Sequence, residues 1–204
     1  MKTESASVEE LSFNLVVLGR TLEHFGAQMY KRREVAIAEL VANAWDAGAN
    51  NVFVEVPSAP QYDPANSQIS ITDDGSGMSP KDIQSAYLVV GRNRRRDGEE
   101  GEEGASENPG ASVPAKRPVM GRKGIGKLAG FGIARKMVVT TWTSESCIQF
   151  MLDIEALKKD DGEAGAVPVP AQYGSSPVET TSGTQVVLQG QPRIAHLARA
   201  GAGG

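Results

Sequence analysis

The segment from Glu34 to Asn50, EVAIAELVANAWDAGAN, constrains the fold more than any other part of the sequence. In a helix, Glu39, Asn43 and Asp46 are spaced i, i+4 and i+7 and therefore share one face. Apolar residues form a stripe on the opposite face: Ile37, Leu40, Val41 and Ala44. Alanines flank the polar trio, which indicates a covered helix whose carboxylates need a partner such as a ligand or metal ion. The alternative is an ordinary amphipathic helix whose three polar side chains face water.

Composition and charge exclude several classes of protein. The chain has 204 residues, of which 40% are hydrophobic and 23% charged, as expected for one globular domain. A formal net charge of -4 gives no electrostatic reason to expect nucleic-acid or membrane binding. The single cysteine, Cys147, excludes an internal disulfide and a cysteine-rich zinc site. No signal-peptide core or membrane-spanning apolar stretch is present, so we expect a cytoplasmic protein without membrane contact.

The apolar periodicity predicts a mixture of helices and strands. Helices are expected at residues 11–29, 34–48, 80–90, 125–135 and 155–159. Strands are expected at residues 51–56, around 69–71, and at 136–143, 147–154 and 184–188. Residues 57–67, 91–118 and 160–182 are expected to be loops, since they are polar or rich in glycine and proline.

A second informative segment is QISITDDGSGMSP, residues 68–80. A short strand leads into Asp73, and Gly75 and Gly77 at the strand end allow a ligand or another backbone segment to approach closely. Ser79, followed by proline, is a good start for the next helix. An Asp-Gly turn that merely joins strand to helix would explain the same residues. A calcium loop does not fit, because the acidic residues do not alternate at the required offsets.

Residues 91–118 are basic at both ends, acidic and glycine-rich between them, and almost without apolar side chains. A loop of this length is usually either disordered or a functional lid. We favour a mobile lid, because a second glycine-rich motif follows immediately.

That motif is GRKGIGKLAGFG, residues 121–132. It fits most of the phosphate-loop pattern, but Leu128 replaces the hydroxyl residue that would hold magnesium, and no strand precedes it as the dinucleotide fingerprint requires. The motif supports a glycine-rich turn that enters a helix. Amides at a helix N-terminus bind phosphate, and Arg122, Lys123 and Lys127 add positive charge. A flexible connector is the alternative, which the interleaved basic residues disfavour.

In this order, the segments resemble the motifs of the GHKL ATPases, the family of gyrase B subunits, ninety-kilodalton heat-shock chaperones, sensor histidine kinases and MutL-type repair proteins. The resemblance covers residues 33–190. The first box matches Glu39, Asn43 and Asp46 with Ala47; the second matches Asp73, Gly75 and Gly77; the third matches Gly121 to Gly126; and the fourth matches Gly183 and Thr184. It implies an α+β fold of the Bergerat type, a two-layer sandwich with helices on one face of a mixed, mostly antiparallel sheet.

The resemblance also implies ATP and Mg²⁺ as ligands. Glu39 would be the general base that activates water, and Asn43 the magnesium ligand. Asp73 would accept a hydrogen bond from the adenine amino group, with Thr184 supporting that contact. The other ATP-binding residues would be Gly75, Gly77, Met78, Arg122, Lys123, Gly124, Ile125, Gly126 and Lys127, with Lys123 or Lys127 neutralising charge on the terminal phosphate. Asp46 is expected to have a structural role.

Glu39 favours hydrolysis over phosphoryl transfer to histidine, because sensor kinases typically lack glutamate at this position. The helix and the glycine-rich turn look closer to MORC-like and chaperone-like bacterial members than to gyrase.

The resemblance also gives the domain bounds. Residues 11–190 are expected to form the ATP-binding domain, with 91–120 as its lid. Residues 1–10 are expected to be a flexible N-terminus, and residues 191–204 a tail truncated before a further domain.

Family members commonly close as ATP-dependent dimers, so a homodimer is expected, with slow or no turnover by an isolated fragment. Two functions stay open: a Mg-ATP hydrolase, and a regulatory module that senses ATP without useful turnover. A protein kinase of the same fold is a third possibility. The sequence does not identify the client, whether nucleic acid or protein.

Overall fold

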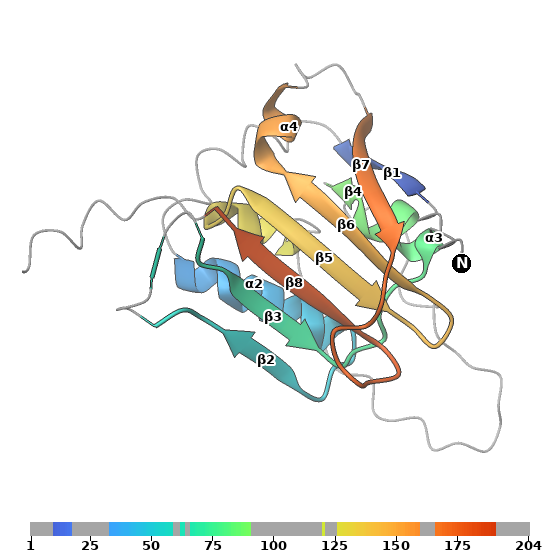
Figure 1. Cartoon of the computed structure of the whole chain (residues 1–204), viewed down its shortest axis with the longest axis horizontal. Coiled ribbons are helices and arrows are strands. Elements are labelled where there is room, and N and C mark those ends of the chain that lie inside the picture. Colours follow the sequence, from blue (N-terminus) through green and yellow to red (C-terminus); the bar gives the residue numbers. More distant parts are fainter. Residues whose placement is uncertain are drawn as a thin grey trace, which may run out of the picture.

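The computed structural model describes residues 10–17, 33–58, 62–63, 66–90, 120, 126–159 and 166–190. These residues form an eight-stranded sheet of order β2-β3-β8-β5-β6-β7-β1-β4, with α2 and the helical segment η3 behind it (Figure 1). The strands are β1 Glu10–Val17, β2 Val52–Glu55, β3 Ile69–Asp73, β4 Val89–Val90, β5 Lys136–Trp142, β6 Cys147–Asp153, β7 Ala166–Tyr173 and β8 Gly183–Gln189. The helical elements are α2 Arg33–Asp46, α3 Pro80–Asp82, the π-helix η2 Ile83–Tyr87, the 3₁₀-helix η3 Gly126–Gly132 and α4 Ile154–Lys159.

The sheet is mixed but mostly antiparallel. Among the described strands only β1 and β4 pair in parallel, and every other pair is antiparallel. Helices packed on one face of such a sheet give the α+β two-layer sandwich that the sequence predicts. The predicted strands at residues 51–56, 69–71, 136–143, 147–154 and 184–188 are all present.

Helix α2 packs against η3 and the sheet through one narrow stripe. Ala36, Leu40 and Ala44 are 5%, 4% and 2% exposed, and their i, i+4, i+8 spacing places them on one face. The helix ends as predicted before Gly48, whose φ of 77° suits the turn after a helix. Ala38 is exposed, so the helix is covered on fewer sides than its alanine content indicates.

The predicted helix over residues 11–29 is wrong in its first part, because residues 10–17 form strand β1. Phe13 and Leu15 alternate with polar residues, and this period of two matches a strand that is buried on one face. β1 lies between β7 and β4, so pairing partners far along the chain decide its conformation. The rest of the predicted helix, residues 18–29, lies outside the described residues.

The predicted loop at residues 160–182 is also wrong in part, because residues 166–173 form β7. Two prolines, Pro168 and Pro170, obscured the strand pattern, since proline removes a donor from a sheet. The pairing of β7 with β6 stops at Ala171, so neither proline faces a β6 residue. Val169 and Ala171, on the alternate positions, are buried.

The helix predicted over residues 80–90 begins where expected but ends early. Ser79 caps it with a capping box, in which its side chain accepts a hydrogen bond from the Asp82 amide and the Asp82 side chain accepts one from the Ser79 amide. The helix continues as η2 and stops at Tyr87, because Val89 and Val90 pair with β1 as β4. The helix predicted over residues 125–135 is the shorter 3₁₀-helix η3.

The hydrophobic core lies between the inner face of the sheet and α2, η2 and η3. Its largest fully buried apolar side chains, apart from Trp142, are Leu15, Ile83, Leu88, Leu128, Met137, Val139, Ile148, Phe150, Leu152 and Leu188. Each such side chain stabilises the fold by about 1.5–3 kcal/mol relative to full exposure. Phe150 makes edge-to-face contacts with Phe13 and Tyr87, at ring-centroid distances of 6.4 Å and 5.6 Å.

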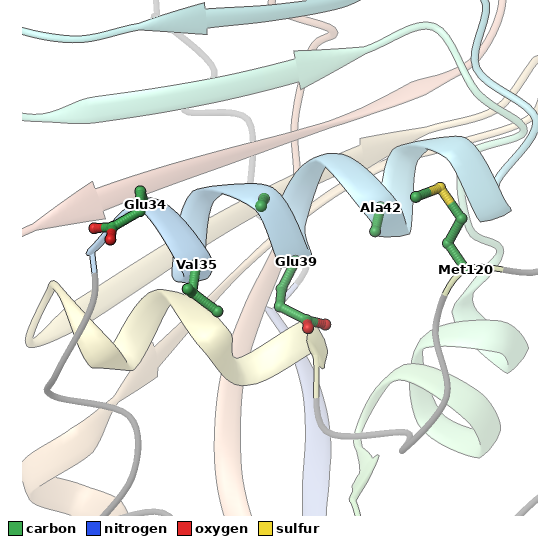
Figure 2. Close-up of a pocket in the computed structure, with 6 residues that line it drawn as sticks. Glu34, Val35, Glu39, Ala42 and Met120 are labelled. Atoms are coloured by element: carbon green, nitrogen blue, oxygen red, sulfur yellow. The ribbon is translucent and has the colours of Figure 1, made fainter.

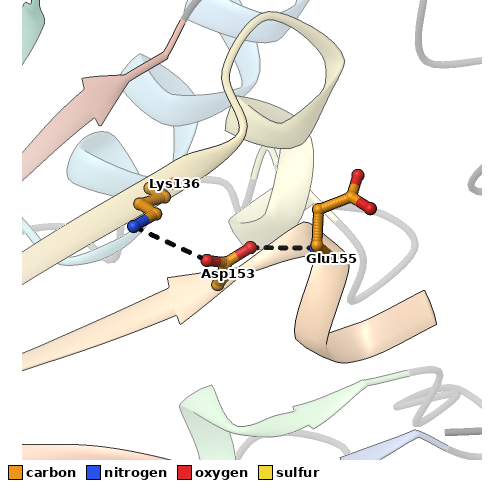
Figure 3. A network of polar contacts seen from close by, with 3 residues as sticks. All are labelled: Lys136, Asp153 and Glu155. Atoms are coloured by element: carbon orange, nitrogen blue, oxygen red, sulfur yellow. Dashed lines mark hydrogen bonds and ion pairs between the residues drawn. The ribbon is translucent and has the colours of Figure 1, made fainter. Parts of the chain in front are cut away.

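At the surface, Asp153 joins β5, β6 and α4 (Figure 3). Its side chain accepts a hydrogen bond of 2.9 Å from the Glu155 amide, near the start of α4. It also lies 3.8 Å from Lys136 Nζ, with the two side chains 28% and 47% exposed. A pair this exposed adds little stability.

Candidate functional site

One end of the site is built around Asp73, at the end of β3. The side chain is 7% exposed, and its Oδ1 accepts a hydrogen bond of 2.8 Å from the Gly75 amide. Strand pairing places Asp73 directly opposite Thr184 of β8. Burial raises the pKa of the Asp73 carboxyl, and the backbone amides of Gly75 and Thr184 oppose this shift. Because few donors bind this carboxylate, it can still accept a hydrogen bond from a ligand.

Gly77 holds the turn after β3 against the sheet. Its φ is 65°, and a Cβ added there would collide with the carbonyl oxygen of Trp142. Both the left-handed backbone and the close approach require glycine. The next residue, Met78, donates its amide to Thr141 Oγ1 at 2.9 Å, so the turn is attached to β5.

Thr141 belongs to this end of the site, although none of the four sequence motifs includes it. It is fully buried and pairs in register with Thr184, and the two hydroxyl oxygens are 3.2 Å apart. Thr141 follows Met137 and Val139 on alternate positions of β5, and these two are also fully buried. A hydroxyl on an otherwise apolar buried face was the signal in the sequence that could have identified it.

The other end of the site is where the first and third motifs meet. A Cβ added to Gly126 would lie 2.7 Å from Glu39 Oε2 and 3.6 Å from Asn43 Oδ1. Glu39 and Asn43 therefore share one face of α2, as predicted, and Gly126, the last residue of the third motif, lies against that face. Gly121 to Ile125, which include Arg122, Lys123 and Gly124, lie outside the described residues, so their roles stay predictions.

A hollow of about 500 Å³ runs along the side of α2 that carries Glu39. Its lining residues are Glu34, Val35, Ala38, Glu39, Ala42 and Met120. Figure 2 shows Val35 and Glu39 pointing to the same side of the helix, with Met120 beside its C-terminal half. Asp73 is not among the lining residues, so this hollow adjoins the Glu39 end of the site and not the Asp73 end.

The Glu39 end of the site contains an oxygen that could bind a magnesium ion. In the described part of the chain, no group of three or more His, Cys, Asp or Glu side chains could hold a metal ion. Magnesium commonly takes one or two protein oxygens and completes its shell with phosphate and water. Asn43 Oδ1, which lies near Gly126 as Glu39 does, could be such a ligand.

Residues 30–184 match the family described as histidine kinase-, DNA gyrase B-, and HSP90-like ATPase. The chain belongs to this ATPase family. The GHKL resemblance seen in the sequence is thereby confirmed, and ATP is the ligand that the family binds.

Several curated proteins are similar to this GHKL chain. A putative type II restriction enzyme, HgiDII of Herpetosiphon aurantiacus, is 30% identical over 91% of this chain and 26% of its own length. The chaperone protein HtpG of Gluconobacter oxydans is 27% identical over 84% of this chain and 26% of its own length. The DNA mismatch repair protein MutL of Clostridium perfringens is 37% identical over 29% of this chain and 8% of its own length. The chain thus spans about a quarter of the first two relatives.

In this GHKL domain the ammonium group of Lys127 is hydrogen-bonded to backbone carbonyl groups. Its Nζ donates to the carbonyl oxygens of Ala86 at 2.5 Å and Val89 at 2.6 Å, and lies 6.0 Å from the centroid of the Tyr87 ring. The lysine therefore ties η3 to the end of η2 and to β4.

Asp46 and Asp74 both accept hydrogen bonds from backbone amides. Asp46 Oδ1 accepts from the Met120 amide at 2.7 Å. Asp74 accepts from the amides of Asn50 and Asn51 and from the Asn51 side chain, which lowers its pKa. These contacts fit a structural role for Asp46.

No described helix of the domain has both the length and the hydropathy that a membrane span requires.

Proposed function

We propose that this GHKL domain binds Mg-ATP and hydrolyses it, with Glu39 as the general base. The observation that carries the proposal is the position of Gly126, where an added Cβ would lie 2.7 Å from Glu39 Oε2 and 3.6 Å from Asn43 Oδ1. It brings a carboxylate, an amide oxygen and the last glycine of the third motif to one place, and hydrolysis of a phosphate needs a base and groups that bind the phosphate. Asn43 would hold the magnesium ion, which when bound would neutralise charge on the phosphate oxygens. Glu39 would then accept a proton from the attacking water.

Asp73 would recognise the adenine amino group. Its burial and its few hydrogen-bond donors support this role, because an unmet acceptor there is costly without a ligand. Thr184, directly opposite, would contact the adjacent ring nitrogen of the base, and Gly75, Gly77 and Met78 would let the purine lie against the backbone.

A nucleotide sensor without turnover is the second candidate, and the position of Lys127 favours it. Its ammonium group is already bound by two carbonyl oxygens, so it is poorly placed to neutralise a phosphate. The role of neutralising the terminal phosphate would then fall to Lys123, or to a group outside this chain.

We also propose that ATP binding closes the segment 91–120 as a lid and promotes a homodimer. Membership of the ATPase family supports this proposal. The names of the restriction enzyme and the mismatch repair protein favour DNA over protein as the client.

The test is ATP binding and single-turnover hydrolysis with magnesium, comparing wild type, Glu39→Gln and Asn43→Ala. Glu39→Gln should bind ATP but release no phosphate, and Asn43→Ala should lose the magnesium dependence of binding. Glu34→Gln, which changes a carboxylate of the same hollow, is the matched control and should behave as wild type. Phosphate release by Glu39→Gln at the wild-type rate would reject Glu39 as the base. Binding without release by every variant, wild type included, would favour the sensor.

A further inference from the structure

We propose that Thr141 is a positioning residue that orients the hydroxyl of Thr184, and so makes the site select a purine with a hydrogen-bond acceptor beside its amino group, as adenine has. The inference rests on the proposed function, because it adds a residue to the same base-binding end of the site.

Thr141 lies where three parts of the site meet. Its Oγ1 accepts the Met78 amide at 2.9 Å, and lies 3.2 Å from the Gly183 carbonyl oxygen and 3.2 Å from Thr184 Oγ1. The side chain is fully buried, so solvent cannot replace these partners. The second motif, the fourth motif and β5 are therefore joined through one hydroxyl group.

The number of protons restricts what this hydroxyl can do. Thr141 has one O–H and must accept from Met78, so it donates either to Gly183 or to Thr184. If it donates to Thr184, the Thr184 hydroxyl is free to donate its own proton to a ligand. If it donates to Gly183, Thr184 donates to Thr141 and offers a ligand only lone pairs.

The partner of Thr184 decides between these two arrangements. Asp73 lies directly opposite Thr184 in the sheet, so a carboxylate acceptor and a hydroxyl group stand side by side. An ionised carboxylate is matched by an amino donor, and in adenine the neighbouring ring nitrogen is an acceptor. To bind adenine in this way, the Thr184 hydroxyl must donate to the ring nitrogen. Thr141 must therefore donate its own proton to Thr184. Guanine presents an oxygen and a ring N–H instead, and its oxygen would face the Asp73 carboxylate with no proton between them.

The variants separate this role from simple packing. Thr141→Val keeps the shape and removes the hydroxyl, whereas Thr141→Ser keeps the hydroxyl. Thr140→Val is the matched control, because Thr140 precedes Thr141 in β5, is also buried, and binds only Gln149 among the described contacts of its hydroxyl. Thr141→Cys, a side chain of similar size with a weak donor, serves as the second variant if Thr141→Val does not fold.

The measurement is the dissociation constant of ATP and of 1-deaza-ATP, in which a C–H group replaces the ring nitrogen. Wild type, Thr141→Ser and Thr140→Val should bind ATP about tenfold more tightly than 1-deaza-ATP, the value of one hydrogen bond. Thr141→Val should bring this ratio close to one, and Thr141→Cys should lower it.

Three results would overturn the inference. A ratio of one in the wild type would mean that Thr184 does not donate to the ring nitrogen, and this result needs no variant. If Thr141→Val discriminates between ATP and 1-deaza-ATP as strongly as wild type does, Thr141 has no role in base selection, although the proposed ATP binding would stand. The same conclusion would follow from Thr141→Cys if that variant is used instead. No ATP binding by the wild type would reject the proposed function, and this inference with it.

Discussion

The backbone amide of Met120 donates a hydrogen bond of 2.7 Å to Asp46 Oδ1, although the two residues are 74 positions apart in the sequence. Asp46 is the last residue of α2, the helix that carries Glu39 and Asn43. Met120 directly follows residues 91–119 and lines the hollow beside Glu39. The bond thus fixes the C-terminal end of the proposed lid segment to the helix that bears the proposed catalytic residues.

We expect Asp46→Ala to release bound nucleotide faster than wild type. A single hydrogen bond of this kind contributes about 0.5–1.5 kcal/mol, so the dissociation rate should rise roughly two- to tenfold. Stopped-flow displacement of a fluorescent ATP analogue measures this rate. Asp46→Asn keeps an oxygen that can accept from Met120 and should match wild type. Equal rates for all three proteins would show that the contact does not retain nucleotide.

Gly126→Ala should impair hydrolysis more than binding. The added methyl would press on the end of the Glu39 side chain, which can move away without disturbing the backbone. A displaced general base should lower the single-turnover rate by about tenfold or more, since positioned bases contribute about 10²–10⁴-fold. Gly174→Ala is the control, because a Cβ there meets no atom within 4 Å. An unchanged rate in Gly126→Ala would argue against Glu39 as the base.

Lys127→Met should destabilise the fold and leave ATP affinity nearly unchanged. The lysine donates to two backbone carbonyls, and a hydrogen bond from a charged group contributes about 1.5–3 kcal/mol, so urea unfolding should show a loss of about this size. Lys136→Met removes only a half-exposed ion pair and should change stability little (Figure 3). Wild-type stability combined with lost hydrolysis would instead assign Lys127 to the phosphate.

Asp73→Asn should stabilise the nucleotide-free protein at neutral pH and abolish the preference for ATP over GTP. Burial raises the pKa of Asp73 above its unfolded value, so between the two pKa values the folded protein holds a proton that the unfolded chain has released. Stability therefore falls as the pH rises through this window, and neutral asparagine avoids that loss. Thermal unfolding against pH, with and without nucleotide, measures both effects.

Asp74→Asn is the matched control and should behave in the opposite way. Hydrogen bonds from Asn51 and Asn50 lower the pKa of Asp74, so its contribution to stability is present above the unfolded pKa and is lost as the pH falls through the folded pKa. The variant should therefore unfold at a lower temperature than wild type at neutral pH. A lower unfolding temperature for Asp73→Asn would mean that its carboxylate is not the costly group inferred here.

The sequence predicted the site best where local spacing decides the geometry. Glu39 and Asn43 share a helix face because they are four residues apart, and Ser79 starts a helix because serine followed by proline forms a cap. Neither inference needs knowledge of the rest of the fold.

Features that depend on distant partners could not be predicted in this way. Val16 becomes a strand residue because it pairs with Ala166 and Val89, which no local pattern reveals. The role of Thr141 is hidden for a related reason. Threonine is common in strands for its shape alone, and only the register with Thr184 shows that its hydroxyl is used.

Strand β8 has a consequence for how the domain is made. It lies between β3, which carries Asp73, and β5, which carries Thr141, and it is the last strand of the described chain. On the ribosome, the strands on either side of β8 are synthesised first, and β2 and β3 have no direct pairing with the other five strands. The nascent chain therefore lacks the proposed base-binding end of the site until β8 has been synthesised. Thr184 and its strand complete the sheet and the base-binding end of the site in a single late step of folding.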